Sequence, residues 1–235
     1  MNWVIGVTTV PARFQGGQLA STLASLRAGG FTDLRLFVDG ATVSGPYETA
    51  FDLPATVRYP AVKAYPNWFL SLSEMYFRNS LADRFIIFQD DVICSKNLRQ
   101  YLETIPYPLD GYWNLYSEPV NEMHVPLDYT GFYPAAAKGK GALGLCFDRT
   151  NVCLLLSSRY MIDRIQNRTP TPNDGYRGES AIDGGVWAAM REVGRREYCH
   201  SPGLLQHARG PSTIGNKDRQ RSKTFKGEGF DCLEW

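Results

Sequence analysis

Short apolar segments alternate with amphipathic segments along the first half of the chain, and this alternation constrains the fold more than any other feature. Helical spacing places Leu19, Leu23 and Leu26 on one face of a predicted helix over 18–27, and a second predicted helix covers 66–79. Strands that alternate with helices form right-handed βαβ units around a mostly parallel sheet, so we expect an α/β fold. Six segments have the length and composition of buried strands: 3–7, 34–38, 56–59, 85–88, 112–116 and 143–147.

The chain length favours one domain. Its 235 residues suffice for one large domain and are few for two, and 43% hydrophobic residues can supply a sizeable core, which excludes disorder as the main state. The net charge of +1 argues against a protein that coats nucleic acid through bulk charge. We find no internal repeat and no linker, and we therefore expect a single domain over 1–235.

The second half of the chain is less regular. Residues 105–134 are rich in proline and aromatic residues and show little periodicity, which fits either a binding loop or a well-packed covering loop. Helices are predicted over 157–167 and 179–193, with a proline- and glycine-containing loop between them.

The N-terminal segment and the cysteines predict a cytoplasmic protein. The first apolar run lacks a basic region before it and stops at Thr8, and no run approaches the roughly 20 apolar residues that span a bilayer, so we expect neither a signal peptide nor a membrane span. An odd number of cysteines without CxxC spacing argues against a disulfide framework or a zinc site. We expect buried, reduced thiols at Cys94, Cys146, Cys153, Cys199 and Cys232.

Two adjacent carboxylates follow the apolar strand at 85–88. Asp90 and Asp91 come at its carboxyl end, where open α/β sheets bind their ligands. Adjacent buried acids need a neutralising cation, and a hard divalent ion such as Mn²⁺ or Mg²⁺ that also holds a diphosphate is suitable. The alternative is an aspartate N-cap with a solvated neighbour before a helix over 95–102.

Two other predicted strands also end in residues that suit a nucleotide. The first is followed by Thr8, Thr9 and Arg13, whose hydroxyls and guanidinium could bind a phosphate or a base edge. The second ends at Asp39, which suits a ribose hydroxyl or a base N–H. The alternative is that these strand ends are polar only because loops begin there.

The order of these motifs resembles the GT-A glycosyltransferases, and the resemblance extends over residues 3–215. The triplet Gln89-Asp90-Asp91 stands where the family has Asp-x-Asp. The resemblance also rests on the Thr8-Thr9 turn, Asp39, Asn67, the glycine-rich segment 139–149, the acidic segment 179–187 and the histidine-containing segment 205–213.

The resemblance implies a set of site residues. It assigns the metal to Asp91 and His207, with Asp90 beside it and Gln89 on the ribose or on the metal through water. Asp183 becomes the catalytic base, with Glu179 as the alternative. The remaining donor-binding residues implied are Thr8, Thr9, Arg13, Asp39, Asn67, Gly141, Ala142 and Lys217, the last on a basic tail that could close over the diphosphate.

The implied activity is metal-assisted, inverting transfer of a sugar from a nucleoside-diphosphate sugar, with UDP as the expected carrier, to a hydroxyl. The acceptor is a glycan, a small molecule or a hydroxymethylated base in DNA. Residues 1–104 would form a Rossmann-like nucleotide-binding half of a GT-A-like sheet, 105–215 the acceptor and catalytic half, and 216–235 the basic tail. The alternatives are a nucleotidyltransferase and a non-catalytic module that binds sugar or nucleic acid.

Overall fold

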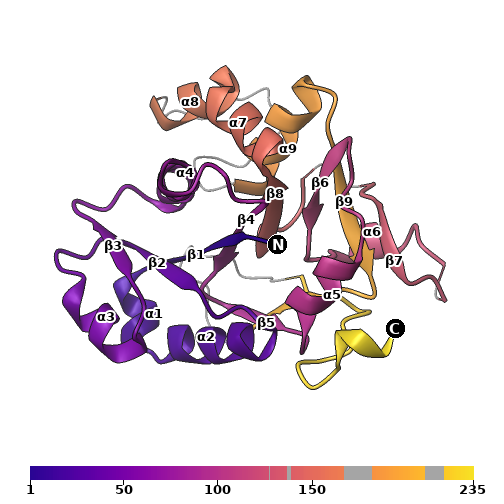
Figure 1. Cartoon of the computed structure of the whole chain (residues 1–235), viewed down its shortest axis with the longest axis horizontal. Coiled ribbons are helices and arrows are strands. Elements are labelled where there is room, and N and C mark those ends of the chain that lie inside the picture. The colour runs from indigo at the N-terminus through magenta and orange to yellow at the C-terminus, as the bar shows by residue number, and fades with distance from the viewer. Residues whose placement is uncertain (127, 137–138, 167–181, 210–219) are drawn as a thin grey trace.

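A mixed β-sheet of eight strands forms the centre of the part of the chain that the structure describes (Figure 1). The structure is a computed structural model, and it describes residues 1–126, 128–136, 139–166, 182–209 and 220–235. The strand order is β3-β2-β1-β4-β8-β6-β9-β7. The strands are β1 (Trp3–Thr9), β2 (Leu34–Asp39), β3 (Ala55–Arg58), β4 (Arg84–Gln89), β6 (Gly111–Asn114), β7 (Gly131–Pro134), β8 (Gly144–Asp148) and β9 (Arg196–Ser201).

The strand directions divide the sheet into two parts. Strands β3, β2, β1 and β4 are all parallel, and the register of β1 with β4 pairs Thr8 with Gln89. Strand β8 is antiparallel to β4 and β6, β9 is parallel to β6, and β7 is antiparallel to β9. The carboxyl ends of β1, β2 and β4 therefore lie along one edge of the sheet, where α/β folds bind ligands.

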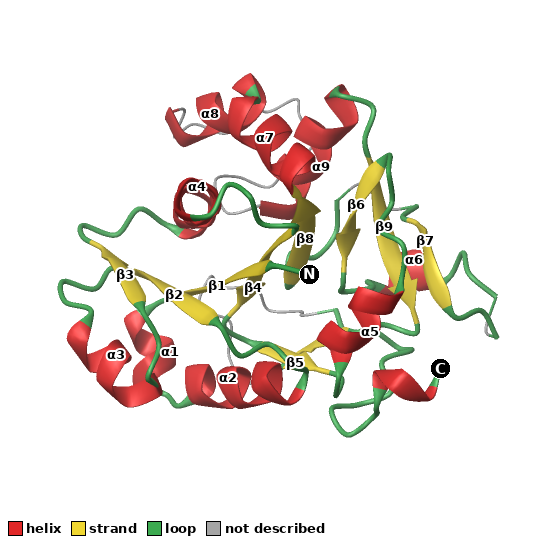
Figure 2. Ribbon diagram, in the orientation of Figure 1, coloured by secondary structure: helices red, strands yellow, loops and turns green. Residues whose placement is uncertain are grey.

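Helices cover both faces of the sheet (Figure 2). One face carries α4 (Ala64–Arg78), α7 (Arg149–Ser157), α8 (Arg159–Gln166) and α9 (Ile182–Glu192). The other face carries α1 (Pro11–Gln15), α2 (Gln18–Ala28), α3 (Gly45–Phe51), α5 (Leu98–Thr104) and a two-stranded ribbon of β5 (Val92–Cys94) and β10 (Leu205–His207). Helix α6 (Pro119–Glu122) lies near β7, and a 3₁₀ turn, η2 (Cys232–Glu234), ends the chain. A buried apolar cluster fills each side of the sheet, which confirms the predicted α/β fold.

All six predicted strands are present, and α2 and α4 match the predicted helices closely. Helix α8 lies within the predicted 157–167, and α9 lies within the predicted 179–193 and ends one residue earlier. The preceding helix α7 was not predicted. The Asp148 carboxylate caps the helix by accepting a hydrogen bond from the backbone N–H of Asn151 (2.7 Å), so α7 starts directly after β8. No loop residues separate the strand from the helix, and the sequence therefore gives no sign of the boundary.

The irregular segment 105–134 contains β6, α6 and β7. The side chains of Tyr112, Trp113, Tyr116 and Tyr133 are buried, whereas Tyr107 is half-buried and Tyr129 is exposed. The aromatic content of this segment is therefore mostly core, which favours the covering-loop interpretation over the binding-loop one.

The prediction for the cysteines is wrong at one position. Cys94, Cys146, Cys199 and Cys232 are buried and free, whereas Cys153 is free and exposed. Helix α7 directs Val152 and Leu155 into the core, so the intervening Cys153 faces outward, where its Sγ lies 3.1 Å from the Tyr76 hydroxyl. No helix among the described residues is long and apolar enough to cross a membrane.

Candidate functional site

One arginine pairs with both carboxylates of the acid pair that follows β4. Arg13 Nε lies 3.3 Å from Asp90 Oδ1, and Arg13 Nη2 lies 3.3 Å from Asp91 Oδ2. All three side chains are buried. The N-cap alternative is therefore wrong, because neither acid is solvated and α5 begins only at Leu98, with Asn97 as its N-cap.

The position of Arg13 follows from the short path between β1 and α1. Only Val10 separates β1 from α1, which begins at Pro11, and the single turn of helix carries Arg13 over the carboxyl end of β4. Burial raises the pKa of Asp90 to about 6, and a hydrogen bond with Thr9 and the charge of Arg13 oppose that rise. The guanidinium thus supplies part of the positive charge that the acid pair requires.

Strand pairing brings the predicted metal ligands together. In the antiparallel ribbon, His207 of β10 lies opposite Val92, the residue after Asp91. His207 Nδ1 is consequently 3.7 Å from Asp91 Oδ2, and the N–H of Ala208 donates to the carbonyl oxygen of Asp91 at 2.7 Å. A carboxylate and an imidazole that are far apart in the sequence become neighbours at the sheet edge.

These two side chains suit a divalent ion that takes its other ligands from a substrate. No group of three or more His, Cys, Asp or Glu side chains within the described ranges is arranged to hold a metal. Mg²⁺ is commonly held by one or two carboxylates together with substrate phosphates and water, and a neutral imidazole is the commonest side-chain metal ligand. The pair Asp91 and His207 fits that arrangement and does not form an all-protein cage.

Thr8, Thr9 and Gln89 border the same edge. The Thr8 hydroxyl lies 3.4 Å from the carbonyl oxygen of Phe88, and the Thr9 side chain is buried beside Asp90. Gln89 is half-buried, and its backbone N–H donates to the carbonyl oxygen of Leu143 at 3.0 Å. The structure therefore brings these three predicted residues to the acid pair.

Asp39 and Asn67 shape the neighbouring loop. The two Asp39 carboxylate oxygens accept hydrogen bonds from the backbone N–H groups of Val62 (2.7 Å) and Lys63 (2.8 Å). Asn67 accepts from Arg58 Nε at 2.9 Å and donates to the Phe37 carbonyl at 3.2 Å. Both side chains lie at the predicted edge, with polar atoms that hold the segment between β3 and α4.

Asp183 is fixed to a glycine turn. The Asp183 carboxylate accepts hydrogen bonds from the N–H of Gly141 (2.7 Å) and from its own neighbour Gly184 (3.0 Å) in the first turn of α9. Gly141 has φ +79°, and a Cβ there would lie 2.2 Å from the Tyr116 ring. The next residue, Ala142, is buried in the core. This turn therefore requires glycine at 141 and connects to Asp183 through its backbone.

Tyr116 joins the two parts of the site. Its ring lies edge-on to His207, with centroids 5.4 Å apart, and its other side abuts Gly141. Its hydroxyl donates to the carbonyl oxygen of Gln220 at 2.6 Å, and Arg221 Nη1 donates to the carbonyl oxygen of His207 at 2.9 Å. The C-terminal segment thus contacts both Tyr116 and His207.

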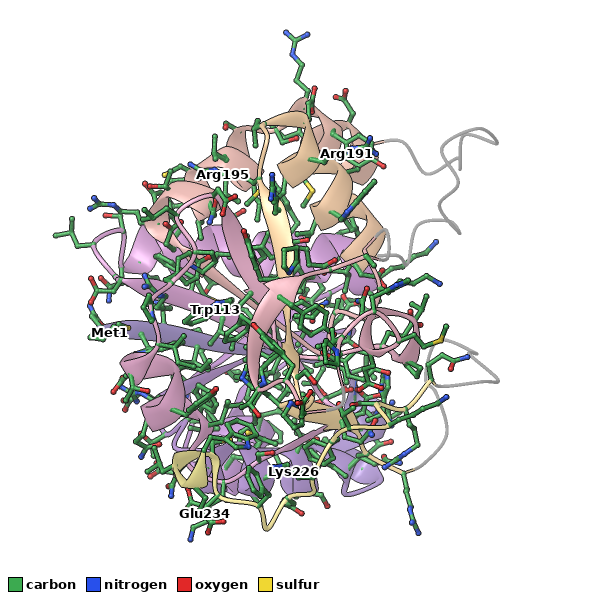
Figure 3. The ribbon with its side chains drawn as sticks, turned by 90° about the vertical axis from the view of Figure 1, so that its right-hand side faces the viewer. Met1, Trp113, Arg191, Arg195, Lys226 and Glu234 are labelled. Atoms are coloured by element: carbon green, nitrogen blue, oxygen red, sulfur yellow. The ribbon has the colours of Figure 1, made fainter. Side chains whose placement is uncertain are left out.

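The basic tail is only partly at the site. Glu179 and Lys217 lie outside the described residues. Of the described tail cations, Arg221 is adjacent to His207, whereas the Lys226 ammonium lies 4.5 Å from the centroid of the Phe230 ring and 5.5 Å from that of Trp235. Figure 3 shows Lys226 at the same end of the molecule as Glu234 and far from Arg191.

Three polar residues near Asp183 were not predicted from the sequence: Asn114, Glu118 and Glu197. Asn114 is a polar residue inside an apolar strand segment, which signals a buried hydrogen-bonding group. Glu197 gave no such signal, because β9 is too rich in charged residues to be recognised as a strand.

Comparisons with known proteins identify the fold. No protein-family model matches the chain, and no curated protein matches it. Among solved structures, S. aureus TarS has a TM-score of 0.51 at 10% identity, over 89% of this chain and 37% of that chain. This likeness shows that the chain has an α/β fold with a mixed, mostly parallel central sheet flanked by helices.

Two further solved structures are similar at lower scores. One is described as a mannose-1-phosphate geranyltransferase from Thermus thermophilus, with a TM-score of 0.49, 13% identity and coverage of 85% of this chain and 74% of that chain. The other is described as a glucose-1-phosphate thymidylyltransferase from Bacillus anthracis in complex with a sucrose, with a TM-score of 0.48, 12% identity and coverage of 87% and 89%.

Proposed function

We propose that this protein is a glycosyltransferase that moves a sugar from a nucleoside-diphosphate sugar to an acceptor hydroxyl. The observation that carries the proposal is the position of Asp91 beside His207 at the carboxyl ends of the parallel strands, 3.7 Å apart. A buried carboxylate and a half-buried imidazole at this edge suit a divalent ion shared with a diphosphate. We take Mn²⁺ or Mg²⁺ as the ion and UDP as the carrier.

The side chains around this pair suit the departing diphosphate. Asp91 and His207 would hold the ion, which when bound supplies positive charge to the leaving group without a proton. Arg221 lies beside His207, and Arg13 bridges Asp90 and Asp91. The exposed Arg221 guanidinium can orient phosphate oxygens through charge-assisted hydrogen bonds, while the buried Arg13 offsets part of the negative charge of the two acids.

Asp183 is the proposed proton acceptor for the attacking hydroxyl. Two backbone N–H groups hold its carboxylate in one orientation, and a fixed base is what proton transfer in a single displacement requires. Such a displacement inverts the anomeric configuration. Glu179 remains the alternative base. The acceptor is a glycan, a small molecule or a hydroxymethylated base in DNA.

The experiment is incubation with a panel of nucleotide sugars and Mn²⁺, read by release of the nucleoside diphosphate and by product mass on an acceptor panel that includes hydroxymethylated DNA. We expect slow donor hydrolysis or transfer that is lost with EDTA and in Asp91→Ala. Release of pyrophosphate from a nucleoside triphosphate plus a sugar phosphate would instead assign a nucleotidyltransferase. Ligand binding without any turnover would assign a non-catalytic binding module.

A further inference from the structure

A buried polar pair lies behind the glycine turn that contacts Asp183. Asn114, the last residue of β6, is fully buried, and Glu197 on the neighbouring strand β9 is 5% exposed. Asn114 Nδ2 donates to Glu197 Oε1 at 2.8 Å. Burial of polar side chains inside a protein costs free energy, so the presence of this pair in the core calls for a structural or functional reason.

The contacts of Asn114 lead to the site. Its Nδ2 lies 2.7 Å from the carbonyl oxygen of Gly141 and 3.2 Å from that of Lys140, and its Oδ1 accepts from the backbone N–H of Tyr116 at 3.1 Å. Gly141 in turn donates its N–H to Asp183. One amide side chain therefore fixes both the turn that holds Asp183 and the residue whose ring lies against His207.

We propose that Asn114 and Glu197 are positioning residues, which hold the turn at 139–141 so that the Asp183 carboxylate keeps one orientation. This inference rests on the proposed function, because it assigns the pair a purpose through Asp183. Neither residue is a catalytic residue: each acts through the backbone of the turn. A displacement of about 1 Å in a reacting group can lower turnover by about a hundredfold, which makes such a support worth its cost of burial.

Glu197 performs this role in its neutral form. Burial raises its pKa to about 8, the hydrogen bond from Asn114 opposes that rise, and the nearby charges of Asp183 and Glu118 add to it. A side-chain hydrogen bond with Tyr112 also opposes the rise, but burial outweighs both hydrogen bonds. The titratable groups that interact with it are Tyr112, Glu118, Tyr133, Asp183 and Cys199, and the nearest cation of the turn, Lys140, lies 4.0 Å from Glu118.

The first test compares Asn114→Ala with a matched control, Asn151→Ala. Asn151 is also buried, and its Nδ2 donates to the carbonyl oxygen of Gly111 at 2.6 Å, away from Asp183. We expect amide hydrogen exchange at Gly141 to become at least about tenfold faster in Asn114→Ala and to stay within about twofold in Asn151→Ala. Donor turnover should fall at least about tenfold in Asn114→Ala, with KM for the donor changed less than about threefold.

The second test is Glu197→Gln, which mimics the neutral acid and keeps Oε1 as an acceptor. At pH 7 we expect turnover within about twofold of the unaltered protein. The unaltered protein should lose turnover as the pH rises through about 8, because ionised Glu197 repels Asp183, and Glu197→Gln should lack that decline.

The outcomes separate this inference from the proposed function. Unchanged exchange at Gly141 in Asn114→Ala, faster exchange with unchanged turnover, or an alkaline decline that persists in Glu197→Gln would each overturn it. If Asn114→Ala does not fold, Glu197→Gln alone decides. If the unaltered protein turns over no donor, the proposed function fails, and exchange at Gly141 still shows whether Asn114 holds the turn.

Discussion

His207 Nδ1 lies 3.7 Å from Asp91 Oδ2, and the ribbon of β5 and β10 sets this distance by pairing His207 with Val92. His207 belongs to this two-stranded ribbon, which is separate from the eight-stranded sheet, and Asp91 lies in the turn between β4 and β5. A contact that depends on strand register is well defined, because a shift by one residue would turn His207 to the other face of the ribbon.

The first prediction concerns this pair. His207→Ala should weaken binding of Mn²⁺ in the presence of UDP by at least about tenfold, because one of two protein ligands is lost. The measurement is the free Mn²⁺ signal in electron paramagnetic resonance titrations. His124→Ala is the control, since His124 is exposed and belongs to no part of the site. Equal Mn²⁺ affinity in His207→Ala and the unaltered protein would remove His207 from the metal site.

The second prediction concerns the buried counter-charge. Arg13→Met should lower the free energy of unfolding by about 3 kcal/mol at pH 7, because Asp90 and Asp91 then remain buried without their guanidinium. Urea denaturation measures this loss. Arg99→Met removes a more exposed ion pair with Glu103 and should cost about 0.5 kcal/mol or less. An equal loss of unfolding free energy in the two variants would show that the buried ion pairs of Arg13 stabilise the protein no more than an exposed pair does.

The third prediction separates backbone strain from steric contact at the glycine turn. Gly141→Ala forces both a positive φ and a clash with Tyr116, so we expect a loss of stability above about 3 kcal/mol or a displaced turn with impaired turnover. Gly194→Ala has a similar φ of +73° and no atom within 4 Å of the added Cβ, and it should cost only about 1 kcal/mol. Thermal and urea unfolding of the two variants measure the difference, and a Gly141→Ala protein as stable and active as Gly194→Ala would contradict it.

The fourth prediction concerns acid stability. His200 is fully buried, its Nε2 lies 2.7 Å from the Tyr101 hydroxyl, and burial lowers its pKa to about 4. The unfolded chain binds a proton near pH 6.5 and the folded protein does not, so this stability is present above pH 6.5 and is lost as the pH falls to about 4.

The expected loss from His200 is about 3 kcal/mol over that interval. Urea unfolding between pH 7 and pH 4 measures it. His200→Gln should be less stable at pH 7 and should lack this part of the pH dependence, whereas His124→Gln should keep it. The same slope in His200→Gln and the unaltered protein would assign the acid sensitivity to other groups.

The four parallel strands β1, β2, β3 and β4 could be predicted from the local sequence pattern alone. The strand over 85–88 could be predicted because its four residues form an apolar run, and they are indeed buried. The two acids, Asp90 and Asp91, could be recognised because they follow that run directly. Arg13 was expected near a nucleotide, but its ion pairs with both acids depend on how tightly α1 follows β1.

The long-range contacts could not be derived from local pattern. The proximity of His207 to Asp91 was implied only by the family resemblance, since it requires the β5–β10 register. The contacts among Asn114, Gly141 and Glu197 join residues far apart in the sequence, and β9, with its charged and polar residues, has no apolar run that marks it as a buried strand. Such contacts arise from sheet topology, which single-sequence periodicity does not encode.

The most direct test of the central claim is a crystal structure of the protein with UDP and Mn²⁺, with the ion located by its anomalous scattering. We predict one Mn²⁺ peak between Asp91 and His207, with the diphosphate oxygens completing its ligands and the nucleoside at the carboxyl ends of β1 and β2. A nucleotide bound at another surface, or a Mn²⁺ peak that contacts neither Asp91 nor His207, would contradict the account.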